Sequence, residues 1–441
     1  MMRPLYSLVM RGVQPLLRRK LRRRGLAEPG YLQHVDERFG VYAERSDSGR
    51  IWIHAVSLGE TRAAAILLEQ LRRQQPGVRV LLTHGTATGR AEGDGLLLPG
   101  DAQAWLPWDT PLAVRRFLQH FRPRVGVLME TEVWPNLVAG CVEQGVPLVL
   151  ANARLSEKSM RQALRLGQLS RPAYAALSAV WAQSGDDARR LARVGATVDG
   201  VFGNLKFDVS AQPVQLALGR GWRQRLARPV VMFASSRAGE EADFFRVLQE
   251  NRDLVRAGWA RRSTDALASA VQWLVVPRHP QRFDEVAALA QERGFSVSRR
   301  SVWTGDPQPA DIWLGDSLGE MALYYAMADA ALLGGSFEPL GGQNLIEAAA
   351  SGCPVVMGPH TFNFADVALL AQQAGAALRV ATVEEAVRTA VALAGDRAQH
   401  DKLAAAALSF AAAHRGAAQR TAQALLALLN VRAAGTSDNR P

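Results

Sequence analysis

The stretch from Ile51 to Gln75, IWIHAVSLGETRAAAILLEQLRRQQ, contains the pattern that decides the fold. It begins with a short, mostly apolar run, passes through SLGE and continues with apolar residues at helical spacing. Such a run predicts a strand buried on both faces, and the segment behind it predicts a helix. Ser57 and Glu60 have the spacing of a capping box, in which both side chains bind amides at the helix start. The same four residues recur at 317–320, where we expect a second capping box.

Apolar runs alternate with helix-like segments over most of the chain. One series starts at residue 51, and a second starts near residue 229 with PVVMFASS and includes PVVMGPH. The segment 204–222 between them contains no buried strand and is interpreted as a crossover linker. Strands that alternate with helices are typical of parallel sheets. We therefore expect an α/β protein of two tandem, Rossmann-like, doubly wound domains that face a cleft.

These patterns divide the chain into four expected parts. They are a basic membrane-anchor segment at 1–28, an N-terminal domain at 29–208, a C-terminal domain at 209–428 and a disordered tail at 429–441. The Ala-rich helical segment at 399–429 lies at the end of the second domain, where we expect it to pack. The two cysteines are far apart and lack partners at ligand spacing, which argues against a disulfide scaffold or a structural zinc site.

The net charge of +11 is concentrated at the N-terminus. Residues 1–24 contain eight Lys and Arg and no acid, which leaves about +3 for the rest, and no nucleic-acid motif follows. The apolar part is interrupted by Arg11 and Pro15, and most cations follow it, unlike a secretory signal. An interfacial anchor on an anionic cytoplasmic membrane surface fits best. A single-pass anchor and a solvated basic tail are the alternatives.

In doubly wound sheets, ligands bind beyond the carboxyl ends of the strands. Glu60 lies at such a position and could serve as a general base, or only as a cap. Glu130 and Glu132 follow the run RVGVLM, where one acid could bind sugar hydroxyls or stabilise positive charge. Another helix cap is the plain alternative, and the acid pair could also suggest a retaining glycosidase. Lys206 could reach a leaving phosphate, or be a solvated linker lysine.

The second series contains the residues that suit a nucleotide. Arg278 follows the run WLVVP and suits bidentate phosphate recognition, with a loop ion pair as the alternative. In GGSFEPLGGQNLIEAAASGCPVV, at 334–356, Gly334–Ser336 could bring backbone N–H groups to a phosphate. A helix expected to start near Asn344 places Glu347 where it could bind ribose hydroxyls, or only cap the helix. No DxD, HxH or HExxH motif occurs, so we expect no catalytic metal and no cofactor.

Seven segments together resemble the 3-deoxy-D-manno-octulosonic acid (Kdo) transferases of lipopolysaccharide biosynthesis. In order they are HAVSLGE, METEVWPN, NARLSEKS, FGNLKFD, PRHPQRF, GGSFEPLGGQNLIEAAASG and GPHTFNF. The resemblance runs from the basic N-terminus to about residue 425. It implies the GT-B glycosyltransferase fold, CMP-Kdo as donor, and an anchor on the cytoplasmic face of the inner membrane. It also implies metal-independent transfer with inversion to the tetraacyl lipid A precursor (lipid IVA), and no nucleic-acid partner.

The resemblance also implies roles for individual residues. Glu60 would be the base that deprotonates the acceptor hydroxyl, and Glu130 and Lys206 would stabilise the transition state. Glu132 and Arg154 would lie on the acceptor side of the site. The residues expected to contact CMP are Pro277, Arg278, Leu318, Gly319, Glu320, Gly335, Ser336, Asn344, Leu345, Ile346 and Glu347.

The sequence departs from the family pattern at three places. Ser236-Arg237 stands where a Thr-His pair is usual, Gln343 where a His is common, and Leu345-Ile346 where a Pro-Leu pair is common. These changes affect the expected fine specificity and leave the proposed Glu and Arg residues in place. Two other functions remain open at this point. They are a GT-B enzyme with another donor, such as a UDP-sugar, and a catalytically silent scaffold on a membrane surface.

Overall fold

The computed structural model describes residues 2–43, 46–208, 212–256 and 271–437. The chain divides into two compact units. Unit 1 comprises Met1–Asp208 together with His414–Pro441, and unit 2 comprises Val209–Ala413. Unit 2 therefore begins at the residue where the sequence places the second domain. The expected end of that domain at residue 428 is wrong, because the chain returns to unit 1 at His414.

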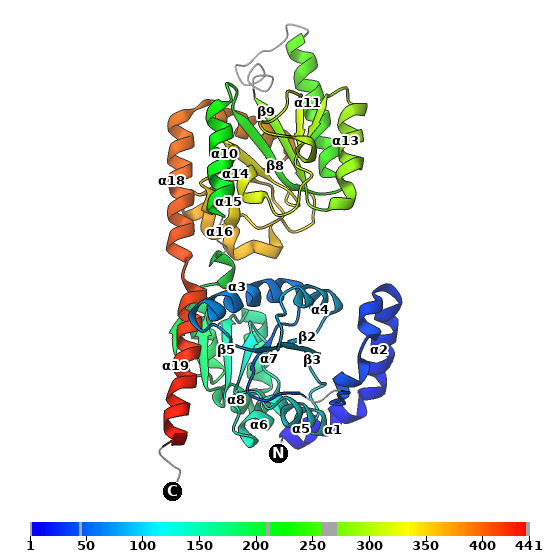
Figure 1. The fold of residues 1–441 in the computed structure, drawn as a ribbon, viewed down its shortest axis with the longest axis vertical. Coiled ribbons are helices and arrows are strands. Elements are labelled where there is room, and N and C mark those ends of the chain that lie inside the picture. Colours follow the sequence, from blue (N-terminus) through cyan, green and yellow to red (C-terminus); the bar gives the residue numbers. More distant parts are fainter. Residues whose placement is uncertain (1, 44–45, 209–211, 257–270, 438–441) are drawn as a thin grey trace. The chain divides into compact units, whose positions relative to one another are not determined.

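Unit 1 is built on a parallel sheet of seven strands in the order β3-β2-β1-β4-β5-β6-β7 (Figure 1). Its central strands are buried along their whole length, which explains their nearly continuous apolar sequence. The strands are β1 (Ile51–His54), β2 (Val80–His84), β3 (Ala102–Trp105), β4 (Val125–Met129), β5 (Leu148–Ala153), β6 (Ala179–Ala182) and β7 (Gly200–Val201).

Helices connect these strands as the alternating pattern predicts. They are α3 (Leu58–Gln74), α4 (Ala87–Asp94), α5 (Pro111–Phe121), α6 (Pro135–Glu143), α7 (Glu157–Arg165), α8 (Gly167–Ala175) and α9 (Gly185–Arg193), with a 3₁₀ turn η3 (Leu205–Asp208) after β7. Several begin with a Ser or Thr N-cap, among them Ser57 before α3 and Thr110 before α5. The resulting α/β arrangement brings the carboxyl ends of β1, β4 and β5 to one edge of the sheet.

The last helix, α19 (Ala417–Ser437), completes the core of unit 1 by packing against α3. Ala418, Ala422 and Leu425 are fully buried among residues of the sheet. Asp208 of η3 also accepts hydrogen bonds from the backbone N–H groups of Gly416 and Ala418. The sequence-based assignment of 414–428 to the second domain fails because an Ala-rich helix does not indicate which sheet it covers. The expected disordered tail at 429–441 is wrong as far as Ser437, where α19 ends, and residues 438–441 lie outside the described residues.

The N-terminal segment forms two helices, α1 (Met2–Gly12) and α2 (Gln14–Ala27), and it belongs to unit 1. Ser7 of α1 is buried and donates a hydrogen bond to Asn136 at 2.9 Å. The segment leads through the 3₁₀ turns η1 (Pro29–Leu32) and η2 (Val35–Phe39) into β1. None of the helices in the described part of the chain combines the length and apolar content needed to cross a membrane.

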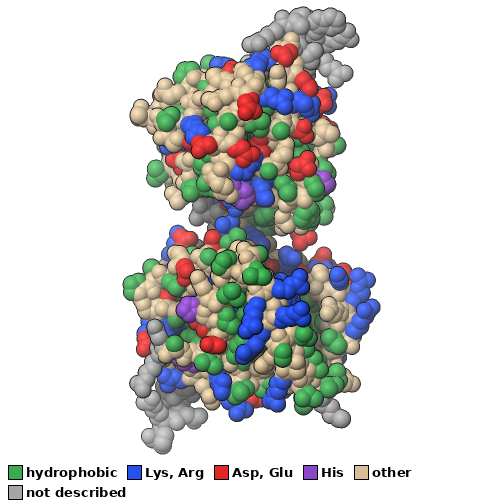
Figure 2. All heavy atoms as spheres, turned by 90° about the vertical axis from the view of Figure 1, so that its right-hand side faces the viewer, with side chains coloured by type: hydrophobic (Ala, Val, Ile, Leu, Met, Phe, Trp, Pro, Cys, Tyr) green, Lys and Arg blue, Asp and Glu red, His purple; other side chains and the backbone are tan. Residues whose placement is uncertain are grey.

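The outer face of these two helices is both apolar and basic. Leu5, Leu8, Val9 and Leu16 are each more than half exposed. Figure 2 shows Lys and Arg side chains gathered on the face of unit 1 that carries α2. The cations of α2 that line one shallow hollow there are Arg19, Lys20, Arg23 and Arg24.

Unit 2 contains a second seven-stranded parallel sheet, in the order β10-β11-β9-β8-β12-β13-β14. The strands are β8 (Val230–Ser236), β9 (Gln272–Pro277), β10 (Val297–Arg299), β11 (Ile312–Leu314), β12 (Ala330–Leu333), β13 (Val355–Met357) and β14 (Ala377–Arg379). Each unit therefore has the predicted doubly wound α/β architecture.

The helices of unit 2 cover its sheet. They are α10 (Pro213–Arg225), α11 (Glu240–Arg256), α13 (Phe283–Glu292), α14 (Met321–Met327), α15 (Ile346–Ser351), α16 (Ala365–Gln373), α17 (Val383–Gly395) and α18 (Arg397–His414), with 3₁₀ turns η4 (Pro280–Arg282), η5 (Arg300–Val302) and η6 (Phe362–Phe364). The expected linker at 204–222 is therefore mostly structured. Its second half is α10, where a Cβ at Gly219 would lie 2.3 Å from the Leu323 carbonyl of α14.

Candidate functional site

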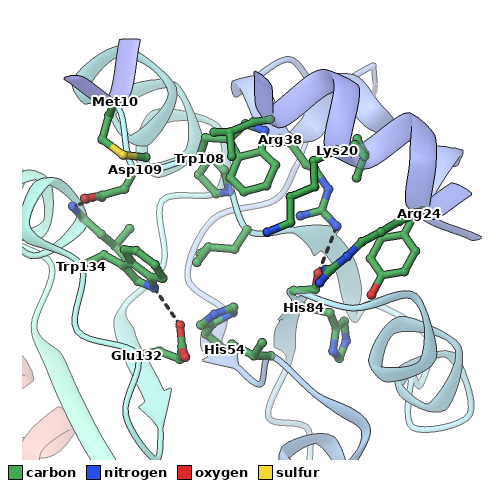
Figure 3. Close-up of a pocket in the computed structure, with 18 residues that line it drawn as sticks. Met10, Lys20, Arg24, Arg38, His54, His84, Trp108, Asp109, Glu132 and Trp134 are labelled. Atoms are coloured by element: carbon green, nitrogen blue, oxygen red, sulfur yellow. Dashed lines mark hydrogen bonds between the residues drawn. The ribbon is translucent and has the colours of Figure 1, made fainter. Parts of the chain in front are cut away.

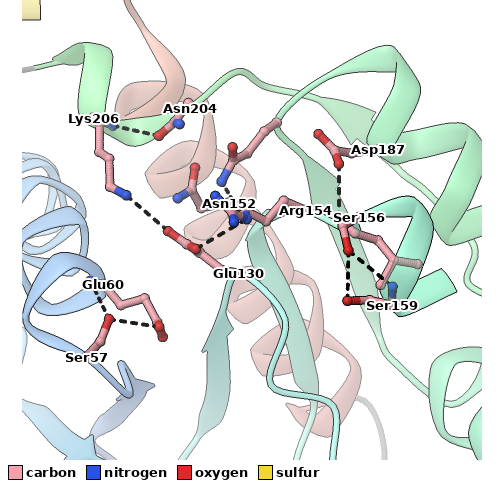
Figure 4. Close-up of polar contacts among 12 residues, drawn as sticks. Ser57, Glu60, Glu130, Asn152, Arg154, Ser156, Ser159, Asp187, Asn204 and Lys206 are labelled. Atoms are coloured by element: carbon pink, nitrogen blue, oxygen red, sulfur yellow. Dashed lines mark hydrogen bonds and ion pairs between the residues drawn. The ribbon is translucent and has the colours of Figure 1, made fainter. Parts of the chain in front are cut away.

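Glu60 forms the predicted capping box at the start of α3 (Figure 4). Its backbone N–H donates to the Ser57 hydroxyl at 3.3 Å. Its carboxylate accepts from the Ser57 hydroxyl at 3.0 Å and from the Val56 N–H at 2.9 Å. Both side chains are half-buried. The cap prediction is confirmed, and it places the carboxylate directly after β1.

The environment of Glu60 also changes its acidity. Burial raises the pKa of this carboxyl to about 7, and the charges of Glu130 and Glu132 add to the increase. The hydrogen bonds from Val56 and Ser57 act in the opposite direction by stabilising the charged form. A carboxylate with a pKa near neutrality can take up a proton at physiological pH, which an ordinary helix cap does not need.

Glu130 follows β4 and carries a strained backbone, with φ of +59°. Its side chain is almost fully buried. One carboxylate oxygen lies 3.5 Å from Nζ of Lys206, and the other lies 3.7 Å from Nε of Arg154. The structure thus brings together three of the predicted site residues, and Figure 4 shows them converging beside Glu60.

Two asparagines hold this cluster in place, and sequence reasoning missed the first of them. Asn152, near the end of β5, has φ of +50° and accepts the Leu205 N–H at 3.0 Å. Asn204 accepts the Lys206 N–H at 3.0 Å. These contacts fix η3, so that Lys206 faces Glu130 (Figure 4). The sequence feature that could have identified Asn152 is its position, because it is a polar residue near the carboxyl end of a fully buried strand.

Glu132 is not part of the ion pairs that Glu130 forms with Lys206 and Arg154. It accepts a hydrogen bond from the indole N–H of Trp134 at 2.8 Å. Burial raises the pKa of its carboxyl, and the charge of Glu130 contributes to the same increase. Glu132 and Trp134 line a cavity of unit 1 (Figure 3). Of the two predicted acceptor-side residues, Arg154 therefore contacts Glu130, whereas Glu132 faces separate, largely apolar surroundings.

In unit 2, the second SLGE does not form the predicted capping box. Gly319 is left-handed, with φ of +78°, and α14 starts only after Glu320. The carboxylate of Glu320 accepts from the guanidinium of Arg300 at 2.8 Å and from the Ser317 hydroxyl. Glu320 is thus held by an ion pair rather than by helix amides. The prediction is wrong because Gly319 turns the chain before a helix can begin.

Arg278 follows β9, directly after Pro277, as predicted. Its backbone N–H donates to the Ser236 carbonyl at 3.0 Å. Its guanidinium Nε donates to the side-chain oxygen of Gln343 at 3.3 Å. This contact joins the expected phosphate-binding arginine to the glycine-rich segment 334–356.

The first glycines of that segment have a different role from the predicted one. The Gly335 N–H donates to Glu240 at 2.7 Å, and the Phe337 N–H donates to the same carboxylate at 3.0 Å. The Ser336 hydroxyl is fully buried and donates to the Leu333 carbonyl. These groups are already used inside unit 2, so we leave Gly335 and Ser336 out of the proposed donor site. Glu240, missed from the sequence, holds this loop.

The segment Asn344–Glu347 is only partly available for a ligand. Helix α15 begins at Ile346, two residues later than predicted. Asn344 accepts the Ile346 N–H at 3.0 Å, and its amide donates to Glu347 at 3.4 Å. The side chains of Leu345 and Ile346 are buried in the core of unit 2, so only their backbone can contact a ligand.

Comparison with known proteins identifies the family. Residues 33–209 match the family model described as 3-deoxy-D-manno-octulosonic-acid transferase (kdotransferase). A Bordetella pertussis 3-deoxy-D-manno-octulosonic acid transferase is 47% identical, over 96% of this chain and 98% of its own length. This chain belongs to the Kdo transferase family. The Haemophilus influenzae transferase is 31% identical, over 95% of this chain and 97% of its own.

Membership of the Kdo transferase family confirms the resemblance predicted from seven motifs and makes the chain a glycosyltransferase. A solved structure of Anabaena Alr3699/HepE in complex with UDP shares the fold. Its TM-score is 0.52 at 14% identity, and the match covers 86% of this chain and all of that one. At this identity the likeness supports the GT-B fold assignment and nothing about the ligand.

Proposed function

We propose that this chain transfers Kdo from CMP-Kdo to the lipid A precursor lipid IVA in lipopolysaccharide biosynthesis, with inversion. The observation that carries the proposal is Glu60. Its carboxylate follows β1 at the start of α3, burial raises its pKa to about 7, and it lies beside the Glu130 cluster. A base poised near neutrality is what abstraction of a hydroxyl proton requires.

In the proposed step, the Glu60 carboxylate accepts the proton of the acceptor hydroxyl as its oxygen attacks the anomeric carbon of Kdo. The bond from that carbon to the phosphate oxygen breaks, and CMP leaves with the bonding electrons. One displacement on one face of the sugar inverts the anomeric centre. A single base therefore suffices, and neither a second carboxylate nucleophile nor a covalent intermediate is needed.

Glu130 and Lys206 would stabilise the charges that develop in this step. The buried carboxylate of Glu130 can stabilise positive charge on the sugar ring, while Lys206, 3.5 Å away, can balance the departing phosphate. Arg154, paired with the same carboxylate, would limit its freedom to move. Because Asn152 and Asn204 fix the backbone around Lys206, these charges are pre-organised.

Unit 2 would bind CMP. Arg278 supplies a guanidinium for the phosphate, oriented by Gln343. Glu347 and Asn344 offer polar groups for the ribose, and the turn Leu318–Glu320 is shaped by the Arg300 ion pair. Pro277 ends β9, so it sets where Arg278 begins to project. In this proposal the protein's own cations neutralise the leaving group.

We also propose that α1 and α2 bind the cytoplasmic surface of the inner membrane. Their exposed face combines Leu5, Leu8, Val9 and Leu16 with the cations of α2. Apolar insertion and attraction to anionic lipids reinforce each other on such a face. Leu8→Glu should release the protein from anionic vesicles in a sedimentation assay, whereas Leu369→Glu, at an exposed site in unit 2, should not. Equal binding by both variants would contradict the anchor.

One experiment tests the reaction itself. Purified full-length protein is incubated with lipid IVA and CMP-Kdo, and the lipid product is analysed by mass spectrometry. We expect a product heavier by one or more Kdo residues, together with stoichiometric release of CMP. A parallel reaction with UDP-sugars should give none. Product formation from a UDP-sugar, without any from CMP-Kdo, would overturn the proposal.

A further inference from the structure

A cavity of about 300 Å³ lies in unit 1 beyond the carboxyl ends of β1, β2, β3 and β4 (Figure 3). Helix α2 lies along one side of it and contributes Leu17 and Leu21. Leu106, Trp108 and Trp134 contribute apolar surface from the segments that follow β3 and β4. The cavity is thus mainly apolar, and it lies at the edge of the sheet where this type of fold binds ligands.

The cavity is also lined by positively charged side chains. Lys20 and Arg24 reach it from α2, and Arg38 reaches it from η2 (Figure 3). Arg38 is 3% exposed, and its guanidinium lies 3.9 Å from the ring centre of Trp105. Burial lowers the pKa of Arg38 to about 10, which still leaves it charged at neutral pH. Its guanidinium already donates a hydrogen bond to the Gly85 carbonyl at 3.2 Å, and a bound anion would further offset the cost of burying this charge.

Three buried polar atoms around this space lack a hydrogen-bond partner within the described residues. They are Nε of Arg38, Nε1 of Trp108 and Nε2 of His54. His54 is 1% exposed, and its other ring nitrogen already contacts the Thr83 hydroxyl at 2.9 Å. Buried polar groups are nearly always paired, so three unpaired atoms around one cavity are groups that a bound polar ligand can satisfy. Two of the three can only donate, which favours an acceptor such as a phosphate oxygen.

The acids that line the cavity cannot balance these donors. Asp109 accepts the backbone N–H groups of Asn136 and Leu137, at 3.0 and 2.8 Å. Glu132 accepts the Trp134 indole N–H. The cavity is therefore apolar over most of its lining, and one side carries cations and hydrogen-bond donors that these acids do not pair with. An alkyl chain that carries a phosphate matches both features.

We propose that this cavity binds one acyl chain of the phosphorylated lipid acceptor, with Arg38, Lys20 and Arg24 contacting its anionic group; this inference rests on the proposed function. Glu132 belongs both to the cavity lining and to the set of acids whose charges act on Glu60. A lipid held here therefore lies next to one of the acids that act on Glu60. Helix α2 then has two roles, because its exposed residues meet the membrane while Leu17 and Leu21 line the acceptor cavity, and Lys20 and Arg24 border both.

Leu17 and Leu26 of α2 provide a matched pair of variants for the chain. Leu17 lines the cavity, whereas Leu26 is 85% exposed and does not. Leu17→Trp should fill the space and raise the KM for lipid IVA at least about tenfold, because an overfilled cavity excludes the chain. The KM for CMP-Kdo and binding to anionic vesicles should not change. Leu26→Trp should leave the KM for lipid IVA at its wild-type value.

Arg24 and Arg22 provide the matched pair for the charge, since Arg24 lines the cavity and Arg22 does not. Calorimetry with dodecyl phosphate should show binding that weakens about tenfold in Arg24→Gln and stays constant in Arg22→Gln, as expected for one charged hydrogen bond. Inorganic phosphate and dodecyl maltoside, which carry only one of the two features, should bind the wild-type protein more weakly. Circular dichroism and thermal unfolding confirm that each variant is folded.

The outcomes separate the cavity from the reaction. Unchanged KM for lipid IVA and unchanged dodecyl phosphate binding in Leu17→Trp would overturn the inference. Reduced vesicle binding with an unchanged KM would also overturn it, by assigning the cavity to a bilayer lipid. Failure of the wild-type protein to transfer any Kdo is a different result, because it contradicts the proposed function before any variant is made.

Discussion

The two SLGE segments have the same sequence and different structures. At 57–60 the serine caps α3, and the glutamate accepts the Val56 amide while facing other acids. At 317–320 the glycine is left-handed, α14 begins one residue later, and the glutamate pairs with Arg300. One carboxyl has a pKa raised to about 7, and the other is held next to a cation. The chemistry of these glutamates is therefore decided by their neighbours.

The largest expected effect separates the two glutamates directly. Glu60→Gln removes the proposed base and should lower kcat for Kdo transfer by about 10²- to 10⁴-fold. Stability should fall by only about 1 kcal/mol, because the amide can still accept hydrogen bonds at the helix start. Single-turnover kinetics and thermal unfolding measure the two quantities. Glu320→Gln is the control, and an equal loss of kcat in both variants would refute the distinction.

The pH dependence of Kdo transfer tests whether Glu60 acts as a base with a raised pKa. Glu60 must be deprotonated to act as a base, so kcat/KM should rise with pH through about 7, the pKa of its carboxyl. Glu130→Gln removes a negative charge that raises this pKa. The rise should therefore shift to lower pH, although the maximum rate also falls. A shift to higher pH, or none, would show that Glu130 does not act on the base.

The ion pair of Glu320 should have a moderate effect on donor binding. Glu320→Gln weakens its contact with Arg300, which is partly exposed, so the KM for CMP-Kdo should rise by at most about fivefold. The initial rate at saturating donor should stay within twofold of wild type, a margin of roughly 0.4 kcal/mol. Asp306→Asn, which breaks the exposed pair with Arg225 in the same unit, should change neither value. A large fall in the saturated rate would instead give Glu320 a role in the chemistry.

The two serines should produce the smallest and most selective effects. Ser57→Ala and Ser317→Ala each remove hydrogen bonds, and each should cost about 1 kcal/mol of stability. Of the two serines, only Ser57 forms a hydrogen bond with Glu60 and lowers its pKa. Ser57→Ala should therefore move the rise in kcat/KM to higher pH, opposite to Glu130→Gln. Ser317→Ala should leave the pH dependence of kcat/KM unchanged. A shift of that profile would contradict the difference between the two serines.

The sequence predicted the local elements well and their partners less well. Continuous apolar runs such as 51–56 indicated buried parallel strands, and Ser57 marked the start of α3 correctly. Ser317 misled because one residue, Gly319, takes a left-handed conformation that no spacing rule indicates. The docking of α19 on unit 1 was missed because an Ala-rich helix can pack against any apolar face.

For the candidate site, the rule that ligands bind beyond the carboxyl ends of strands identified site residues correctly where few polar residues follow a strand. It selected Glu60, Glu130 and Lys206, which the structure brings together. It failed for Leu345 and Ile346, whose side chains are core residues, because a loop sequence does not show which way each side chain points. The cavity was missed as well. Its signal was a histidine ending each of two apolar strands, at His54 and His84, which lie at one edge only after the strands pair.

The way α19 completes unit 1 affects the timing of folding during synthesis. Domains near the N-terminus usually fold while the rest of the chain is still being made, at about 5–20 residues per second. Here Ala418, Ala422 and Leu425 belong to the core around β1, although more than 200 residues, including all of unit 2, are translated in between. The last helix must therefore emerge from the ribosome before unit 1 can complete its core. Until then, the apolar face of α3 lacks the helix that covers it.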